Sequence, residues 1–213
     1  MARKEFDLSG FTGVEVRNAM KLDVRQGESF SVAVEADDEA LKDVKVSLAD
    51  GRLLAKLEPR WGHIGLIFKG VSSPKLIVTM PELKYIELAA ASRGEITGFT
   101  GLESFQVILA GASSLTGDIV CKVLKLEGGA ASHFVLSGSA ERAEIELSAA
   151  SNANLEKMSV GDAKVKLGGA STMTINMTGK LDAEVSGAST LRYLGSSAIG
   201  DLKVTGASSF SKK

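Results

Sequence analysis

The sequence contains one cysteine, two histidines, three prolines and one tryptophan in 213 residues. The single cysteine, Cys121, excludes an internal disulfide framework and a cysteine-rich zinc site. His63 and His133 are too few for a multi-histidine metal site, so we expect neither a metal nor a cofactor. Because 25 Lys and Arg nearly balance 26 Asp and Glu, the chain lacks the general basic surface that nucleic-acid binding requires. No apolar run approaches the ~18 residues of a transmembrane helix.

Aromatic residues are also scarce, at 5% of the chain, whereas glycine is abundant, with 23 residues. A hydrophobic core must therefore be built from Val, Ile, Leu, Met and Ala, packed around many small residues. The length is ample to bury such a core.

An internal repeat dominates the sequence from residue 83 onward. The dipeptide Ala-Ser recurs seven times, at a spacing of about 19 residues. Four and six residues before each serine the side chains are mostly apolar, and five and seven residues before it they are mostly polar. This period-two alternation is typical of a β-strand with one buried face. The repeated serines are Ser92, Ser113, Ser132, Ser151, Ser171, Ser189 and Ser208.

Each repeat contains a strand, a corner of small residues, a second strand and a glycine turn, with no room for a crossover helix. This order predicts an all-β fold, a parallel β-helix or β-solenoid, for which right-handed winding is favoured. We expect the repeated serines to stack as a structural ladder and to hydrogen-bond to the backbone or to the next serine. Within one continuous unit, residues 1–27 are predicted to form a divergent first rung, residues 28–82 an irregular β-strand excursion that caps one end, and residues 83–213 the seven-repeat solenoid.

The excursion shows its own short alternating segments. They predict strands at residues 29–36, 44–48, 52–57, 64–68 and 75–80, and one helical turn near residues 37–41. Asp50-Gly51 indicates a hairpin between two of these strands.

The whole chain resembles a bacterial family, the putative auto-transporter adhesins with a head GIN domain, a domain of unknown function common in Bacteroidetes. The resemblance rests on residues 10–16 (GFTGVEV), 20–27 (MKLDVRQG) and 78–84 (VTMPELK), and on the Gly-Ala-Ser repeats. It implies a β-helical fold in an exported or envelope-anchored protein, in the periplasm or at the cell surface, and it supplies no catalytic residues. The first seven residues hold no apolar signal core, so the leader of an exported protein would lie outside this sequence.

Two sets of residues are candidates for chemistry or binding. Asp182, Glu184 and Asp201 would lie on neighbouring rungs, where paired carboxylates could serve a carbohydrate-active enzyme. The alternative is that they are outward positions of a solvated face, because lysines and glutamates share the same rows. Arg60, Trp61 and His63 form the most individual segment; they could stack on a sugar or anchor a partner, or Trp61 could plug the solenoid end or a dimer seam.

The favoured hypothesis is a non-enzymatic extracytoplasmic interaction module, adhesin-like, which binds a glycan or an envelope protein. The alternatives are a carbohydrate-active enzyme on a β-helix and a purely structural, self-assembling protein. Flat solenoid faces are also compatible with a homodimer or homotrimer.

Overall fold

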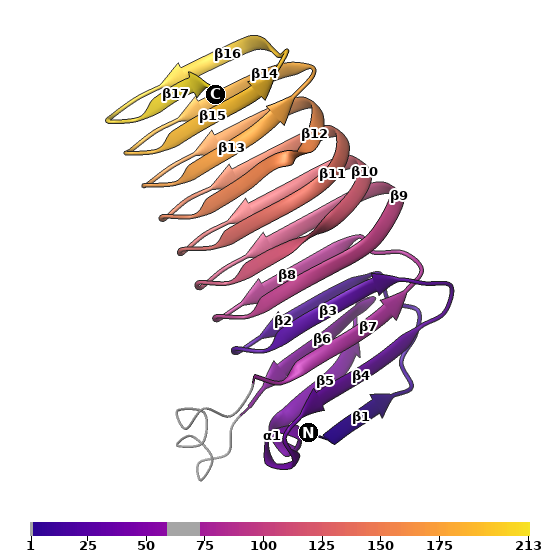
Figure 1. Ribbon diagram of the computed structural model, residues 1–213. Helices are drawn as coiled ribbons and strands as arrows, with labels where there is room; N and C mark the ends of the chain where they lie inside the picture. Colours follow the sequence, from indigo (N-terminus) through magenta and orange to yellow (C-terminus); the bar gives the residue numbers. More distant parts are fainter. Residues whose placement is uncertain (1, 59–72) are drawn as a thin grey trace.

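The computed structural model describes residues 2–58 and 73–213 (Figure 1). Within these residues the chain forms 17 strands and one six-residue helix. The predicted β-solenoid is confirmed, with about seven coils of roughly 19 residues. Arg60, Trp61 and His63, and the strand predicted at residues 64–68, lie outside the described residues.

Each coil contributes strands to two parallel sheets that enclose the core. We call them the first and the second sheet. In the first sheet lie β2 (Gly13–Arg17), β8 (Tyr85–Ala89), the C-terminal parts of four long strands, β14 (Lys180–Val185) and β16 (Ala198–Val204). In the second sheet lie β3 (Lys21–Gln26), the N-terminal parts of the same long strands, β13 (Thr172–Met177), β15 (Thr190–Gly195) and β17 (Ser209–Lys212). The long strands are β9 (Arg93–Leu109), β10 (Ser114–Gly128), β11 (His133–Leu147) and β12 (Asn152–Leu167).

The glycine turn predicted after the second strand of each repeat is wrong for these long strands. Each of β9 to β12 continues through the bend as one strand of 15–17 residues. The reason lies in the close stacking of bare backbone at the bend. A Cβ on Gly117 would lie 2.6 Å from the carbonyl oxygen of Ile96, and one on Gly138 would overlap the carbonyl oxygen of Ile119. Glycine therefore bends the chain without separating the coils, and parallel pairing continues.

The core lies between the two sheets and consists of stacked apolar rows, as the alternation predicts. Val165 and Leu167, for example, are buried, while Lys164 and Lys166 between and beside them are exposed. Side-chain volumes on facing sheets compensate one another. Where the first sheet has Gly128 in place of leucine, the ring of Phe134 in the second sheet fills the space.

The N-terminal end of the solenoid is closed by antiparallel strands. In the first sheet, β6 (Arg52–Leu57) pairs parallel with β2, and β5 (Val44–Ala49) then pairs antiparallel with β6. In the second sheet, β7 (Lys75–Met80) pairs parallel with β3, followed by antiparallel β4 (Ser31–Ala36) and β1 (Ala2–Phe6). The predicted hairpin is confirmed, with Asp50 and Gly51 at φ 50° and 70° between β5 and β6.

The helix α1 (Asp38–Asp43) follows β4 at this end of the molecule (Figure 1). It is far too short to cross a bilayer, and no other helix occurs in the described residues.

Candidate functional site

The repeated serines lie at the tight corner between the first and the second sheet. Six are buried and Ser208, on the last coil, is half-buried. In five of the seven, from Ser92 to Ser171, the hydroxyl donates to the carbonyl oxygen three residues earlier, as in Ser113 to Ala110 (2.8 Å) and Ser132 to Gly129 (2.6 Å). At Ser113 the oxygen also accepts the backbone N–H of Ser92 on the preceding coil (3.2 Å). These bonds satisfy buried polar groups at the corner, which is a structural role.

The corner itself requires left-handed backbone. Ala149 and Ala150 have φ of 50° and 63°, and every other corner has at least one residue with positive φ, which is alanine or glycine except for Asn18 in the first coil. Larger side chains are disfavoured in this conformation, so the Gly-Ala-Ser pattern follows from the corner geometry.

The acidic candidates do come together, but on an open and electrically balanced face. Asp182, Glu184 and Asp201 line a shallow depression of about 370 Å³ on the first sheet, together with the lysines Lys164, Lys166 and Lys203. Lys180 Nζ lies 2.9 Å from Asp182, and Lys203 Nζ lies 2.9 Å from Glu184.

The pKa shifts of Asp182 and Glu184 do not suit the general acid of a glycosidase. Hydrogen bonds from Lys180 and from the backbone N–H of Asp201 lower the pKa of Asp182, and the Lys203 ammonium lowers the pKa of Glu184. A general acid in such an enzyme needs a raised pKa. The arrangement favours the interpretation as a solvated, mixed-charge face.

A larger groove, of about 610 Å³, crosses the second sheet. Two outward rows line it over four successive coils. One row consists of Glu95, Thr116, Val135 and Asn154, which are neighbours in the parallel register. The other consists of Thr97, Asp118, Ser137 and Glu156. The register of the strands shifts beside this groove, after Gly117, Val135 and Leu155, and such bulges bend a strand and redirect its side chains.

Some polar atoms of the groove side chains form hydrogen bonds within the protein, and others have no partner among the described residues. Ser137 Oγ donates to Asp118 Oδ1 at 3.2 Å, and Asn154 Oδ1 accepts the backbone N–H of Glu156 at 3.1 Å. These contacts orient both side chains. Asp118 Oδ2 and Asn154 Nδ2 form no hydrogen bond with any of the described residues. Val135 lies between the polar groups with 37% of its surface exposed, so it places an apolar contact in the groove.

A second polar cluster, on the first sheet near the N-terminal end, is already saturated. The guanidinium of Arg52 covers the ring of Tyr85 at 3.9 Å and forms an ion pair with Glu15 at 3.0 Å. Tyr85 donates to Glu87 at 2.7 Å, and burial together with this acceptor raises the pKa of Tyr85. The Arg52 guanidinium therefore already covers one face of the Tyr85 ring.

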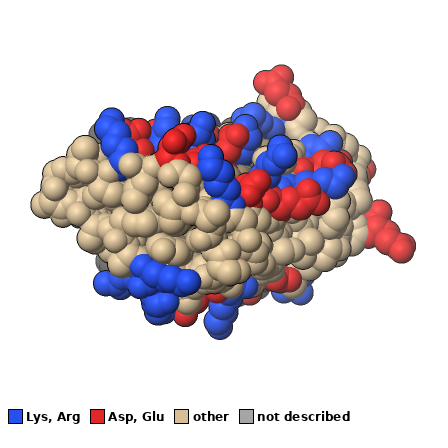
Figure 2. Space-filling model, turned by 90° about the horizontal axis from the view of Figure 1, so that it is seen from above, with Lys and Arg blue, Asp and Glu red and all other residues tan. Residues whose placement is uncertain are grey.

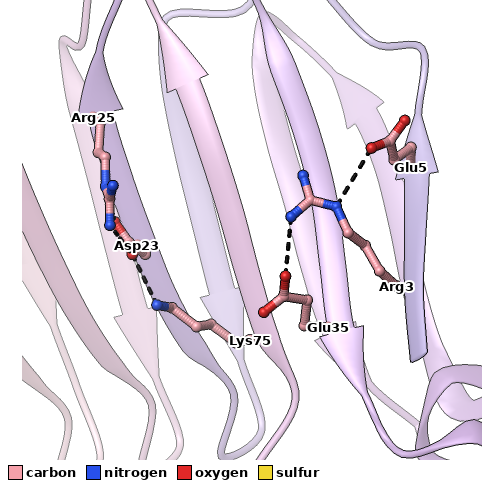
Figure 3. A network of polar contacts seen from close by, with 6 residues as sticks. All are labelled: Arg3, Glu5, Asp23, Arg25, Glu35 and Lys75. Carbon is pink, nitrogen blue, oxygen red and sulfur yellow. Dashed lines mark hydrogen bonds and ion pairs between the residues drawn. The ribbon is translucent and has the colours of Figure 1, made fainter. Parts of the chain in front are cut away.

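The buried carboxylate of Asp23 on β3 is likewise paired. Arg25 donates two hydrogen bonds of 2.9 Å to it, and Lys75 on β7 donates one of 2.8 Å (Figure 3). Burial raises the pKa of Asp23, but the bonds from Arg25 and Lys75 outweigh this effect and hold it below its ordinary value. On the outer strands Arg3 connects β1 to β4 through Glu35 at 2.9 Å. Both groups tie neighbouring strands of the second sheet together.

The described residues show neither a cluster of metal-ligating side chains nor an accessible thiol. Within the described ranges, no three His, Cys, Asp or Glu side chains are grouped to hold a metal ion. Cys121 is buried, and burial raises the pKa of its thiol to about 11, so the reactive thiolate is scarce at neutral pH.

The sequence predicted none of the groove residues as a site. Thr116, Ser137 and Asn154 have the spacing of ordinary outward strand positions. The one available signal was mid-strand glycine, at Gly117 and Gly138, because glycine inside a strand pattern indicates a bulge.

Comparisons with known proteins agree with this architecture. No curated protein matches the chain. A putative adhesin from Bacteroides fragilis is structurally similar, with a TM-score of 0.85, 16% identity, and coverage of 100% of this chain and 96% of that chain. A putative lipid binding protein from Parabacteroides distasonis gives a TM-score of 0.72, 14% identity and coverage of 100% and 96%. For a putative adhesin from Parabacteroides merdae the values are 0.67, 13%, and 100% and 95%.

These likenesses concern the fold. The family assignment comes from the sequence itself, since the model of one family matches residues 10–197, which is most of the chain. The protein therefore belongs to the family described as putative auto-transporter adhesin, head GIN domain.

Proposed function

We propose that the protein is a non-enzymatic, extracytoplasmic, adhesin-like module whose groove on the second sheet binds a glycan. One observation carries the proposal: two outward rows place hydroxyl, amide and carboxylate groups around the exposed Val135 across four coils. Sugars present hydroxyl donors and acceptors together with apolar C–H faces. A concave surface with an apolar centre and several fixed polar groups is complementary to both.

The repeat favours an extended ligand over a compact one. Neighbouring coils lie about 4.8 Å apart, so the same outward position recurs at a constant interval along the groove. A polymeric glycan would meet Thr116, Val135 and Asn154 in succession. The location in the periplasm or at the cell surface is supported by the family and by the adhesin names of its structural relatives.

A glycan array followed by titration of the best ligand tests the proposal. Asn154→Ala and Val135→Ser should each weaken binding about tenfold, the equivalent of ~1.4 kcal/mol, because each removes one direct contact. Glu146→Ala is the matched control: Glu146 is an exposed strand residue of β11 on the first sheet, outside the groove, and its substitution should leave binding unchanged. Equal losses for all three variants would argue against the groove.

Arg60, Trp61 and His63 remain the other proposed contact set. If the glycan binds in the groove, Trp61→Ala should leave the affinity of the protein for the glycan unchanged. A loss of binding with Trp61→Ala, combined with normal binding by Asn154→Ala, would move the site to residues 60–63. If no glycan binds and an envelope protein is captured instead, the ligand class proposed here is wrong.

A further inference from the structure

The C-terminal end of the solenoid is an open coil. Among the described residues, β16 pairs only with β14, and β17 only with β15, so the outer edge of each strand carries unpaired N–H and C=O groups. Ile199, Leu202 and Val204 continue the buried rows of the first sheet but are 39–42% exposed. Figure 2 looks down on this end and shows a broad surface without charged groups, bordered by Lys, Arg, Asp and Glu side chains.

The opposite end shows how this fold terminates its parallel sheets. There the chain adds an antiparallel strand to each sheet, β5 on β6 and β4 on β7. Both sheets are thereby covered together. At β16 and β17 the described chain supplies no such strand, so the equivalent antiparallel neighbours are missing from both sheets at once.

We propose that the coil formed by β16 and β17 binds the same coil of a second copy of the chain about a two-fold axis. A two-fold axis perpendicular to both sheets reverses the direction of every strand and keeps each sheet on its own side. It therefore gives β16 an antiparallel neighbour from the second copy, and gives β17 one as well. The interface is isologous and closed, the commonest symmetry of soluble oligomers, and it repeats the geometry of the N-terminal end.

The charges on β16 select the register. Asp201 and Lys203 are exposed and flank Leu202 on the outward side of the strand, just after a register shift of β16 against β14. With the axis at Leu202, Asp201 of each copy faces Lys203 of the other, and the two Leu202 side chains pack together. Moving the axis by one residue would place Asp201 opposite Asp201 or Lys203 opposite Lys203. Opposite charges in directly facing antiparallel positions stabilise a strand pair, and like charges destabilise it.

Lys203 already forms an ion pair with Glu184 of the preceding coil, at 2.9 Å, so in the dimer its ammonium would lie between Glu184 and Asp201 of the second copy. The remaining charges of the coil do not oppose this contact. Lys213 Nζ forms an ion pair with Glu156 of β12 at 2.7 Å, so its charge lies at the side of the solenoid. Lys212 is the last residue of β17 and belongs to the other sheet from the Asp201–Lys203 pairs. Phe210 on β17 stacks on Tyr193 of the preceding coil, with ring centroids 5.1 Å apart, which fixes the edge that the second copy would meet.

Sedimentation equilibrium of the 213-residue chain over a wide concentration range tests the proposal by charge reversal. The wild-type chain should be a dimer. Lys203→Asp and Asp201→Lys should each raise the dimer dissociation constant at least about tenfold, since each creates two like-charge pairs. The double variant restores both pairs with the signs exchanged and should dimerise like the wild type. Lys166→Asp, on an outward position of the interior strand β12, is the matched control and should have no effect.

Several outcomes would overturn the inference. A chain that stays monomeric at every concentration would do so, as would growth into larger assemblies, which indicates head-to-tail contacts. So would single variants that dimerise normally, or a double variant that fails to recover. Because both charged residues are exposed, circular dichroism should show unchanged folding in every variant. The groove lies far from these substitutions, so a monomeric single variant should still bind glycan, and the two proposals fail independently.

Discussion

Gly128 occupies a core position at which coils on either side carry Leu109 and Leu147. A Cβ added to Gly128 would lie 2.7 Å from Cε2 of Phe134 and 2.8 Å from Cδ2 of Leu147. Neither distance is tolerated without movement of the neighbours. We therefore expect Gly128→Ala to destabilise the protein by about 1–3 kcal/mol, the usual cost of overpacking a core. This sign is opposite to the general rule, since replacing a strand glycine by alanine ordinarily stabilises by ~0.5–1 kcal/mol.

A double-mutant cycle attributes the effect to the ring. Phe134→Ala removes a fully buried aromatic side chain and should cost about 3–5 kcal/mol. It also vacates the space that the new methyl group needs. The double variant Gly128→Ala/Phe134→Ala should therefore lose less than the sum of the single changes, by roughly 0.5–3 kcal/mol.

Urea unfolding followed by far-ultraviolet circular dichroism measures all three changes, provided that the slope m stays constant. Gly129→Ala is the matched control, because its Cβ would meet only Ser148 Oγ, at an ordinary 3.6 Å. That substitution should be neutral or stabilise by up to ~1 kcal/mol. The packing argument is refuted if Gly128→Ala is as stable as the control, or if the changes at residues 128 and 134 add within ~0.5 kcal/mol.

Further substitutions, thiol labelling and pH titration test the strand register and the buried groups. Leu167→Ala should cost about 2–5 kcal/mol and Lys166→Ala less than ~0.5 kcal/mol in the same unfolding assay; similar small values would contradict the strand register. Asp23→Asn should lower stability at pH 7 by about 1–2 kcal/mol, and the deficit should shrink below pH ~4, because a lowered pKa stabilises only while the carboxylate is ionised. The thiol of Cys121, whose pKa burial raises to about 11, should react with a thiol reagent at pH 8 only on unfolding. Rapid labelling of the native protein would disprove the burial of Cys121. Because its pKa is raised in the folded state, the free energy of unfolding should fall as the pH rises from the ordinary thiol pKa toward 11.

The strand faces were predictable because the same alternation occurs seven times. A single segment such as residues 164–167 could be a chance pattern, but the repeat aligns Val165 and Leu167 with apolar residues on other coils. The corner serines were predictable for the same reason. The glycine bends were not, because Gly117 and Gly138 suit both a turn that ends a strand and a bend inside one. Only the contact between coils, 2.6 Å for a Cβ on Gly117, distinguishes the two.

The groove was not predictable for a related reason. The position of the groove depends on register shifts between neighbouring coils, after residues such as Val135 and Leu155. The alternation of polar and apolar residues along one strand does not indicate where such shifts occur. For the acidic candidates, the sequence predicted the position but not the ion pairs. Their proximity was foreseen from the row alignment, yet Lys180 and Lys203 neutralise Asp182 and Glu184, and the repeat alone does not reveal that pairing.

Each coil of the solenoid has strand edges that can pair with another strand on both of its sides. The two ends of the solenoid can therefore differ only where the sequence departs from the repeat. At the N-terminal end the departure is a change of strand direction. At the C-terminal end β16 keeps the apolar rows and carries Asp201 and Lys203 on the outward side. A parallel, in-register copy of that strand would set Asp201 over Asp201 and Lys203 over Lys203. An antiparallel copy centred on Leu202 sets each against its opposite. The charge order therefore favours a closed pair, which leaves both outer ends covered by β5 and β1 and stops growth at two copies.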